Sequence, residues 1–180
     1  PLFVFRHRMS KQADTILGLY LYDGLFDTAE LRRNFEFYQK TTLHHSSLST
    51  CIFGLLACRI GDTPLAADYF TQSARMDLDD VHQNVYAGIH AANMAGSWLT
   101  VANGFGGLRT GSGQLCFAPQ LPPNWEGYRF RVYWRGAVVE CAVSKSGASY
   151  TLIEGAPVTF CHCGQTLQLQ HKGECCHAEL

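Results

Sequence analysis

Gly104-Phe105-Gly106-Gly107-Leu108 separates two patterns of hydrophobic residues, and this division decides the fold class. Before it, apolar side chains recur every three or four residues, as in helices that bury one face. From about Arg109 onward they recur every second residue, as in strands that bury one side. The sequence therefore predicts a helical part over residues 1–108 and a β domain over residues 109–180.

The helical part is predicted to contain several helices joined by short connections. Gly61-Asp62-Thr63-Pro64 is typical of the end of one helix and the start of the next, with Asp62 or Thr63 as the cap. The predicted last helix has a small-residue face, which permits close contact with another helix, at Ala91, Ala92, Ala95 and Gly96. Apolar residues at helical spacing mark the other buried faces: Ile16, Leu19 and Tyr20; Leu31, Phe35 and Tyr38; and Leu48, Ile52, Leu55 and Leu56.

The β domain is predicted from alternation and from turn residues. A hairpin at Arg135-Gly136 lets two sets of residues pair across neighbouring strands. About five or six strands of this kind predict a small antiparallel β-sandwich. The paired sets are Phe130, Val132 and Trp134 on one strand and Val139, Cys141 and Val143 on the next.

The composition is that of a globular protein and argues against several classes of partner. Of the 180 residues 47% are hydrophobic, which is enough for a core. Fourteen Lys and Arg against fifteen Asp and Glu give a net charge of −1, so no basic field attracts a nucleic acid. No apolar run reaches the roughly 20 residues of a membrane helix, and Pro1-Leu2-Phe3-Val4-Phe5 is too short for a signal-peptide core. We expect a cytoplasmic protein without a nucleic-acid or membrane partner, and a truncated boundary at Pro1.

The eight cysteines are predicted to be reduced and to hold no metal. Cys161-His162-Cys163 and Cys175-Cys176-His177 offer soft ligands to zinc, but structural zinc sites usually use Cys-x-x-Cys spacing. We therefore expect an irregular tail that contains Cys and His. Four other cysteines lie in apolar patterns and are predicted to be small core residues: Cys51, Cys58, Cys116 and Cys141.

Thr42-Leu43-His44-His45-Ser46-Ser47-Leu48-Ser49 is the strongest candidate for a binding site. It precedes an apolar run predicted as a helix, and the first N–H groups of a helix lack partners and lie at the positive end of its dipole. With the hydroxyls of Ser46 and Ser47, they predict an anion site, with phosphate as the natural ligand. The alternative is a plain helix start, with Ser46 or Ser47 as the N-cap and the histidines solvated or packed in the core.

Four further motifs accompany this stretch in order: Lys11-Gln12-Ala13-Asp14, Phe37-Tyr38, Gly88-Ile89-His90-Ala91-Ala92-Asn93-Met94-Ala95-Gly96 and Gly104-Phe105-Gly106-Gly107. Together they resemble the C-terminal part of glycoside hydrolase family 65, which contains inverting phosphorylases of maltose, kojibiose, nigerose and trehalose. The resemblance runs from about Lys11 to about Phe160. It implies the C-terminal helices of an (α/α)6 barrel followed by a small β-sandwich.

The resemblance also assigns roles to single residues. Ser46, Ser47 and His90 match the family's phosphate-binding positions, and Lys11 and Gln12 match positions that hydrogen-bond the glucosyl unit. Without the resemblance, His90 would be read as a capping or core histidine, and Lys11 and Gln12 as an exposed pair at a helix start.

The family's general acid is a glutamate upstream of the positions in this chain, so the isolated chain is expected to be inactive. The acidic residues that are present are predicted to be solvated charges or caps. They are Glu30, Glu36, Asp77, Asp79, Asp80 and Glu140.

The implied reaction is cleavage of an α-glucosidic disaccharide by inorganic phosphate, with inversion, to give β-glucose 1-phosphate. Phosphate is already a nucleophile, so it needs positioning and charge compensation more than a second carboxylate. No metal or organic cofactor is implied, and the parent protein is expected to be a homodimer, as many relatives are.

Two alternatives stay open. Some family members are hydrolases that use an acidic residue near the phosphate loop as a base. No carboxylate lies between Thr41 and Thr50, which favours phosphorolysis. His45 stands where an acidic residue is common in the family's phosphorylases, and this departure leaves the preferred substrate open. The other alternative is a non-catalytic carbohydrate-binding or interaction module, which would be stable by itself and bind sugar regardless of phosphate.

Overall fold

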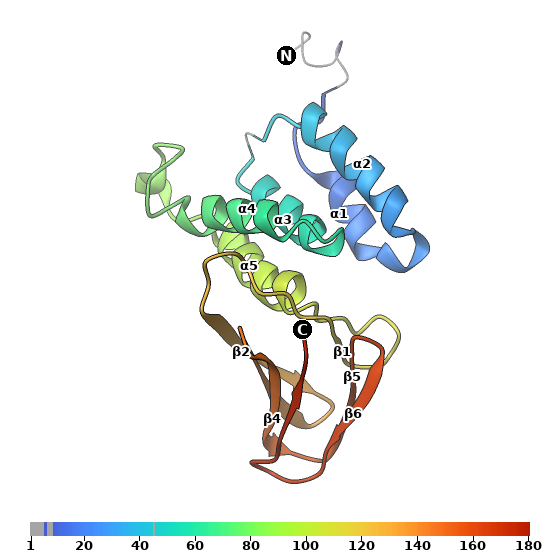
Figure 1. Cartoon of the computed structure of the whole chain (residues 1–180). Coiled ribbons are helices and arrows are strands. Elements are labelled where there is room, and N and C mark those ends of the chain that lie inside the picture. The colour runs from blue at the N-terminus through green and yellow to red at the C-terminus, as the bar shows by residue number, and fades with distance from the viewer. Residues whose placement is uncertain (1–5, 7–8, 45) are drawn as a thin grey trace. The chain divides into compact units, whose positions relative to one another are not determined.

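The chain forms two compact units, which divide between Gly104 and Phe105. The computed structural model describes residue 6, residues 9–44 and residues 46–180, so the expectation for His45 lies outside the described residues. The first unit is helical and the second is built from strands, as Figure 1 shows. The predicted fold class, helices followed by a small β domain, is confirmed.

Five α-helices make up the described part of the first unit: α1 (Asp14–Leu21), α2 (Thr28–Thr41), α3 (Ser49–Arg59), α4 (Thr63–Arg75) and α5 (Ala91–Leu99). Short 3₁₀ turns occupy Asp23–Leu25 and Val85–Ala87, and a π-helical segment, Thr100–Phe105, follows α5. As predicted, Asp62 caps α4: its Oδ1 accepts a hydrogen bond from the N–H of Leu65 at 3.2 Å, and Pro64 lies in the first turn.

Helix α3 is buried on nearly all sides, because α1, α2, α4 and α5 all pack against it. Phe53 and Ala57 are fully buried, whereas Leu48, just before the helix, is 38% exposed. The one-sided apolar face predicted for this segment is therefore wrong in part. A helix at the centre of a bundle has no solvent face, so spacing alone cannot identify its buried side.

The close contact predicted for the small-residue face of α5 is confirmed at Gly96. A Cβ atom at this position would lie 2.4 Å from Sγ of Cys51 and 2.7 Å from its Cβ atom. Helices α3 and α5 therefore approach each other at a distance that only a glycine permits. Cys51 and Cys58 are both buried in α3, as predicted.

The second unit contains seven described strands: β1 (Cys116–Phe117), β2 (Gly127–Trp134), β3 (Ala137–Ser144), β4 (Gly147–Gly155), β5 (Val158–His162), β6 (Gln165–Leu169) and β7 (Cys175–Ala178). They form one sheet in the order β1-β5-β6 and another in the order β2-β3-β4-β7. All pairings are antiparallel except that of β1 with β5, which is parallel. The tail expected to be irregular thus contributes an edge strand.

The predicted hairpin register is confirmed, since Phe130 lies opposite Cys141 and Val132 opposite Val139. Aromatic rings fill the space between the two sheets: the ring of Tyr150 on β4 lies 4.8 Å from that of Phe160 on β5. Burial raises the pKa of the Cys141 thiol to about 12, as expected for a small core residue. Cys116, predicted to be buried, is only half-buried at the edge of its sheet.

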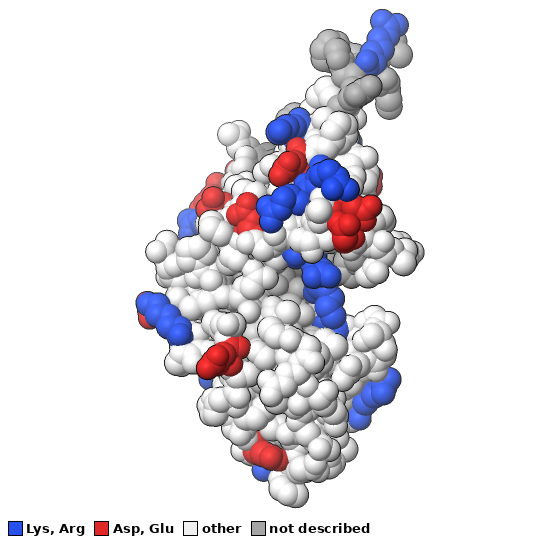
Figure 2. Space-filling model, turned by 45° about the vertical axis from the view of Figure 1, so that its right-hand side comes forward, with Lys and Arg blue, Asp and Glu red and all other residues white. Residues whose placement is uncertain are grey.

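Charged residues of both signs are interspersed over the helical unit on the face shown in Figure 2. This mixture agrees with the net charge of −1. Among the described residues, no helix combines the length and the apolar character needed to cross a membrane.

Gly96→Ala tests the α3–α5 contact, and Gly18→Ala in α1 is its matched control. Because a Cβ at Gly96 would collide with Cys51, we expect a loss of about 1–3 kcal/mol of unfolding free energy. A Cβ at Gly18 meets nothing within 4 Å, so alanine there should be neutral or stabilise the helix by up to about 1 kcal/mol. Chemical denaturation measures both; equal effects would contradict the close approach.

Candidate functional site

Two of the predicted site segments lie side by side in the helical unit. Ser10 forms a parallel bridge with Thr42, in which the N–H of Ser10 donates to the carbonyl of Thr41 at 2.9 Å. The N–H of Leu43 donates in turn to the carbonyl of Ser10 at 2.9 Å. This bridge holds the start of Lys11-Gln12 against the loop that leads to Ser46 and Ser47.

A cavity of about 260 Å³ lies among α1, α3 and α5. Each of the three segments that carry predicted site residues contributes to it: Gln12 from the Lys11-Gln12 segment, Leu48 from the loop that contains Ser46 and Ser47 (the serine loop), and Ala92 from the segment that contains His90. The small residues Ala92, Ala95 and Gly96 form one wall. We call this space the α1–α3–α5 cavity. Of the five predicted binding residues, only Gln12 is part of its lining.

The serine loop ends in a turn rather than in a serine cap. Helix α3 begins at Ser49, its N-cap residue is Leu48, and no side chain caps it. Ser46 instead closes the turn: its Oγ accepts from the N–H of Leu48 at 3.3 Å and its carbonyl accepts from the N–H of Ser49 at 3.0 Å. The alternative that made Ser46 or Ser47 the N-cap is therefore wrong.

His44 is a packed residue, as the plain helix-start alternative predicted for the histidines. Its ring lies 4.7 Å from that of Phe53, and its Nε2 is 3.2 Å from the carbonyl oxygen of Gln39. Its backbone adopts a φ of 53°, in the left-handed region, where histidine is found more often than most side chains. The chain therefore turns sharply just before the serines.

His90 is the N-cap residue of α5, which begins at Ala91. Asp77, from the loop after α4, binds it twice. Oδ2 of Asp77 accepts the backbone N–H of His90 at 2.8 Å, and Oδ1 lies 2.5 Å from Nδ1 of the ring. The side chain of Asp77 is 6% exposed and that of His90 is 22% exposed.

The Asp77 carboxylate is held in its charged form by this arrangement. The hydrogen bond from the His90 ring lowers the pKa of Asp77 most, followed by the one from the His90 backbone. His82, whose ring centre lies 5.9 Å from that of His90, lowers it further. Asp77 was predicted to be a solvated or capping carboxylate. The structure instead buries it beside a predicted site residue.

A buried polar group joins α4 to α5 and so fixes the ends that carry Asp77 and His90. The amide of Asn93 donates to the carbonyl of Ser73 at 2.7 Å and accepts from the hydroxyl of Ser73 at 2.7 Å. That hydroxyl also lies 2.8 Å from the hydroxyl of Ser97. Ser73 and Asn93 are each 1% exposed.

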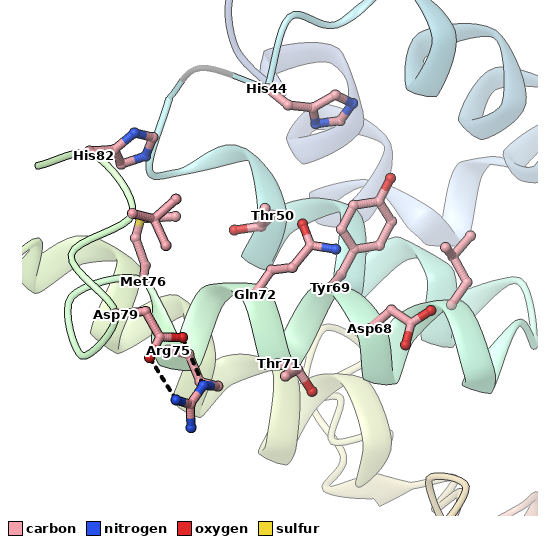
Figure 3. A pocket seen from close by; sticks show the side chains of 12 residues that line it. His44, Thr50, Asp68, Tyr69, Thr71, Gln72, Arg75, Met76, Asp79 and His82 are labelled. Atoms are coloured by element: carbon pink, nitrogen blue, oxygen red, sulfur yellow. Dashed lines mark hydrogen bonds and ion pairs between the residues drawn. The ribbon is translucent and has the colours of Figure 1, made fainter.

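A larger cavity, of about 720 Å³, lies between the loop before α3, helix α4 and the loop after α4. Figure 3 shows Tyr69 and Gln72 rising from α4 on the side of Thr50 and His44, while Arg75 and Asp79 form an ion pair at its edge. None of Lys11, Gln12, Ser46, Ser47 and His90 lines this cavity. We therefore place the candidate site at the smaller α1–α3–α5 cavity, where the predicted segments meet.

The buried histidine of the strand unit is held within the fold. His162 is buried, with Nδ1 2.7 Å from the hydroxyl of Tyr150 and Nε2 2.8 Å from the carbonyl oxygen of Glu179. Both ring nitrogens are thus engaged within the fold. No group of three or more His, Cys, Asp or Glu that could hold a metal ion occurs among the described residues.

Comparison with protein families assigns the chain. Residues 3–99 match the glycosyl hydrolase family 65 central catalytic domain, and residues 108–169 match the C-terminal domain of the same family. The first match alone covers more than half of the chain, so the chain belongs to glycoside hydrolase family 65. The predicted resemblance is confirmed.

Individual relatives share most of this chain. It is 41% identical over 173 residues to an alpha,alpha-trehalose phosphorylase of Thermoanaerobacter brockii, covering 96% of this chain and 22% of the relative. It is 37% identical over 155 residues to a maltose phosphorylase of Bacillus subtilis, covering 86% of this chain and 20% of the relative. The solved structure titled "Putative kojibiose phosphorylase from human microbiome" superimposes with a TM-score of 0.86 at 29% identity, covering 94% of this chain and 24% of that one. The chain thus spans between a fifth and a quarter of the length of these relatives.

Asn93→Ala tests the buried polar group that supports the site. The substitution leaves the hydroxyl and the carbonyl of Ser73 without their amide partner in a dry environment, so we expect a loss of about 2 kcal/mol of unfolding free energy. Asn34→Ala is the matched control, because the Asn34 amide only donates to the carbonyl of Glu30 within its own helix. Comparable losses in the two variants, measured by urea unfolding, would argue against a special role for Asn93.

Proposed function

We propose that the protein containing this chain is a disaccharide phosphorylase that cleaves an α-glucosidic disaccharide with inorganic phosphate. The observation that carries the proposal is the meeting of three segments at the α1–α3–α5 cavity. One segment holds the positions expected to bind sugar, and the other two hold those expected to bind phosphate. Relatives named as trehalose and maltose phosphorylases support the same reaction.

The proposed roles follow the chemistry of the side chains. Lys11, which is exposed, and Gln12, which lines the cavity, would hydrogen-bond the glucosyl unit through an ammonium and an amide. Ser46, Ser47 and His90 would bind phosphate. The hydroxyls of the two serines can donate to phosphate oxygens, and the His90 ring can form a further hydrogen bond to the phosphate.

Unpaired buried groups near the serine loop support a polar ligand there. Among the described residues, Thr42 Oγ1, Ser49 Oγ and Thr50 Oγ1 are buried without a hydrogen-bond partner. Buried hydroxyls are normally paired, because an unpaired one forfeits its hydration. Their concentration on both sides of Ser46 and Ser47 indicates that the fold alone does not satisfy the polar groups of this loop.

In the proposed reaction a phosphate oxygen attacks the anomeric carbon as the glycosidic bond breaks, with inversion. The leaving oxygen takes a proton from a general acid, which the family resemblance assigns to a glutamate upstream of this chain. The products are β-glucose 1-phosphate and the released sugar. In this proposal α1–α5 are the last helices of an (α/α)6 barrel, the enzyme is cytoplasmic, and no metal or organic cofactor takes part.

Phosphate dependence is the first test. The full-length protein should release glucose from trehalose, maltose or kojibiose only when inorganic phosphate is present. It should form one β-glucose 1-phosphate, identified by NMR, for each bond cleaved. Equal cleavage without phosphate would indicate a hydrolase instead. Saturable sugar binding that is indifferent to phosphate, without cleavage, would indicate a binding module.

The serine loop is tested by the double variant Ser46→Ala/Ser47→Ala in the full-length protein. Removing hydroxyl donors to a charged ligand should raise the KM for phosphate about 10- to 100-fold. The control is Ser144→Ala/Ser146→Ala, because these two hydroxyls bond each other at 2.8 Å in the strand unit. A KM for phosphate that stays at the control value would exclude the loop as the phosphate site.

A further inference from the structure

The carboxylate of Asp77 decides which nitrogen of His90 can face a ligand. A carboxylate only accepts hydrogen bonds, so the 2.5 Å contact between Oδ1 and Nδ1 requires a proton on Nδ1. The other oxygen of Asp77 is occupied by the backbone N–H of His90 at 2.8 Å. Nε2 is therefore the ring nitrogen left for another partner.

The orientation of the His90 ring is fixed from more than one side. Asp77 lies two residues beyond the end of α4, and His90 directly precedes α5. These two helices are joined by the buried bonds between Ser73 and Asn93. His82, from the intervening loop, packs edge-on against the His90 ring with centres 5.9 Å apart. The ring is thus held before any ligand arrives, which is what precise binding of an anion requires.

The proton fixed on Nδ1 determines how Nε2 can bind a ligand. In the neutral imidazole with its proton on Nδ1, Nε2 is a hydrogen-bond acceptor. Such an acceptor can take a hydrogen bond from the hydroxyl group of hydrogen phosphate.

We propose that Asp77 is a positioning residue for phosphate: it fixes the proton on Nδ1 of His90 and leaves Nε2 to accept a hydrogen bond from the phosphate. This inference rests on the proposed function, in which His90 contacts phosphate. It adds to that function a residue outside the motifs that carry the predicted site residues. A carboxylate that merely capped α5 would contribute to stability and leave phosphate affinity unchanged.

Asp77→Asn tests this role in the full-length protein, with Asp79→Asn as the matched control. An asparagine can offer its single oxygen to the backbone N–H of His90, so its NH₂ group would then face Nδ1 and donate to it. We expect the KM for phosphate to rise at least about tenfold. The KM for the disaccharide and kcat should change by less than about twofold. Asp79 forms an exposed ion pair with Arg75, and its variant should match the wild type.

Histidine-selective ¹⁵N labelling supplies a second readout that a purely structural role would not change. The His90 signal is assigned by its loss in His90→Gln. In the wild type Nδ1 should be protonated; in Asp77→Asn the proton should move from Nδ1 to Nε2, while Asp79→Asn leaves the signal unchanged. The wild-type spectrum is informative even if Asp77→Asn fails to fold, because an unprotonated Nδ1 there overturns the inference.

The outcomes separate this inference from the proposed function. Phosphate-dependent cleavage with equal phosphate KM values for Asp77→Asn and Asp79→Asn overturns the role of Asp77 and leaves the phosphorylase intact. Cleavage by the wild type that does not need phosphate overturns both. A raised phosphate KM together with a displaced Nδ1 proton in Asp77→Asn alone supports both.

Discussion

The buried amide of Asn93 is the constraint on which the geometry of the helical unit depends. With 1% of its surface exposed, Asn93 has lost its hydration and must recover hydrogen bonds inside the protein. Ser73 supplies them through both its hydroxyl and its carbonyl, which fixes the rotation of α5 against α4. Since His90 directly precedes α5 and Asp77 follows α4, this buried pair helps to hold the two residues in contact.

Small side chains allow the same helices to gather around α3. Gly96 lies against Cys51, and Gly54 lies so close to Tyr69 that a Cβ would be 3.3 Å from the Tyr69 Cβ atom. Desolvation raises the pKa of the Cys51 thiol, so this residue acts as a compact neutral side chain. Because α3 starts directly after the serine loop, its burial also fixes where Ser46 and Ser47 lie in relation to α1 and α5.

Features that depend on neighbouring residues could be predicted from the sequence, and those that depend on distant residues could not. The hairpin at Arg135-Gly136 and the cap at Asp62 follow from turn and capping preferences over a few residues. The parallel pairing of β1 with β5 joins Cys116 to Cys161 across the intervening hairpins, and no local pattern encodes it. The all-round burial of α3 likewise depends on four other helices.

In the candidate site, too, the sequence could predict only features that depend on neighbouring residues. The motifs identified the segments that meet at the cavity, because each motif is contiguous in the sequence. They missed Asp77, which is separated from His90 by the whole loop between α4 and α5. Its only sequence signal was an acidic residue just beyond a predicted helix, a feature shared with Asp79 and Asp80. Asp79 pairs with Arg75, and Asp80 accepts the N–H of Asn84, so sequence alone cannot separate these three acids.

The engagement of Asp77 also bears on the choice of nucleophile. A hydrolase that inverts configuration needs a carboxylate free to take a proton from water. Both oxygens of Asp77 are occupied by His90, so this carboxylate could activate water only by releasing the histidine. In the proposed site, a carboxylate committed in this way would orient the His90 ring. An oriented ring of this kind would serve a nucleophile that arrives already charged, as phosphate does in the proposed reaction.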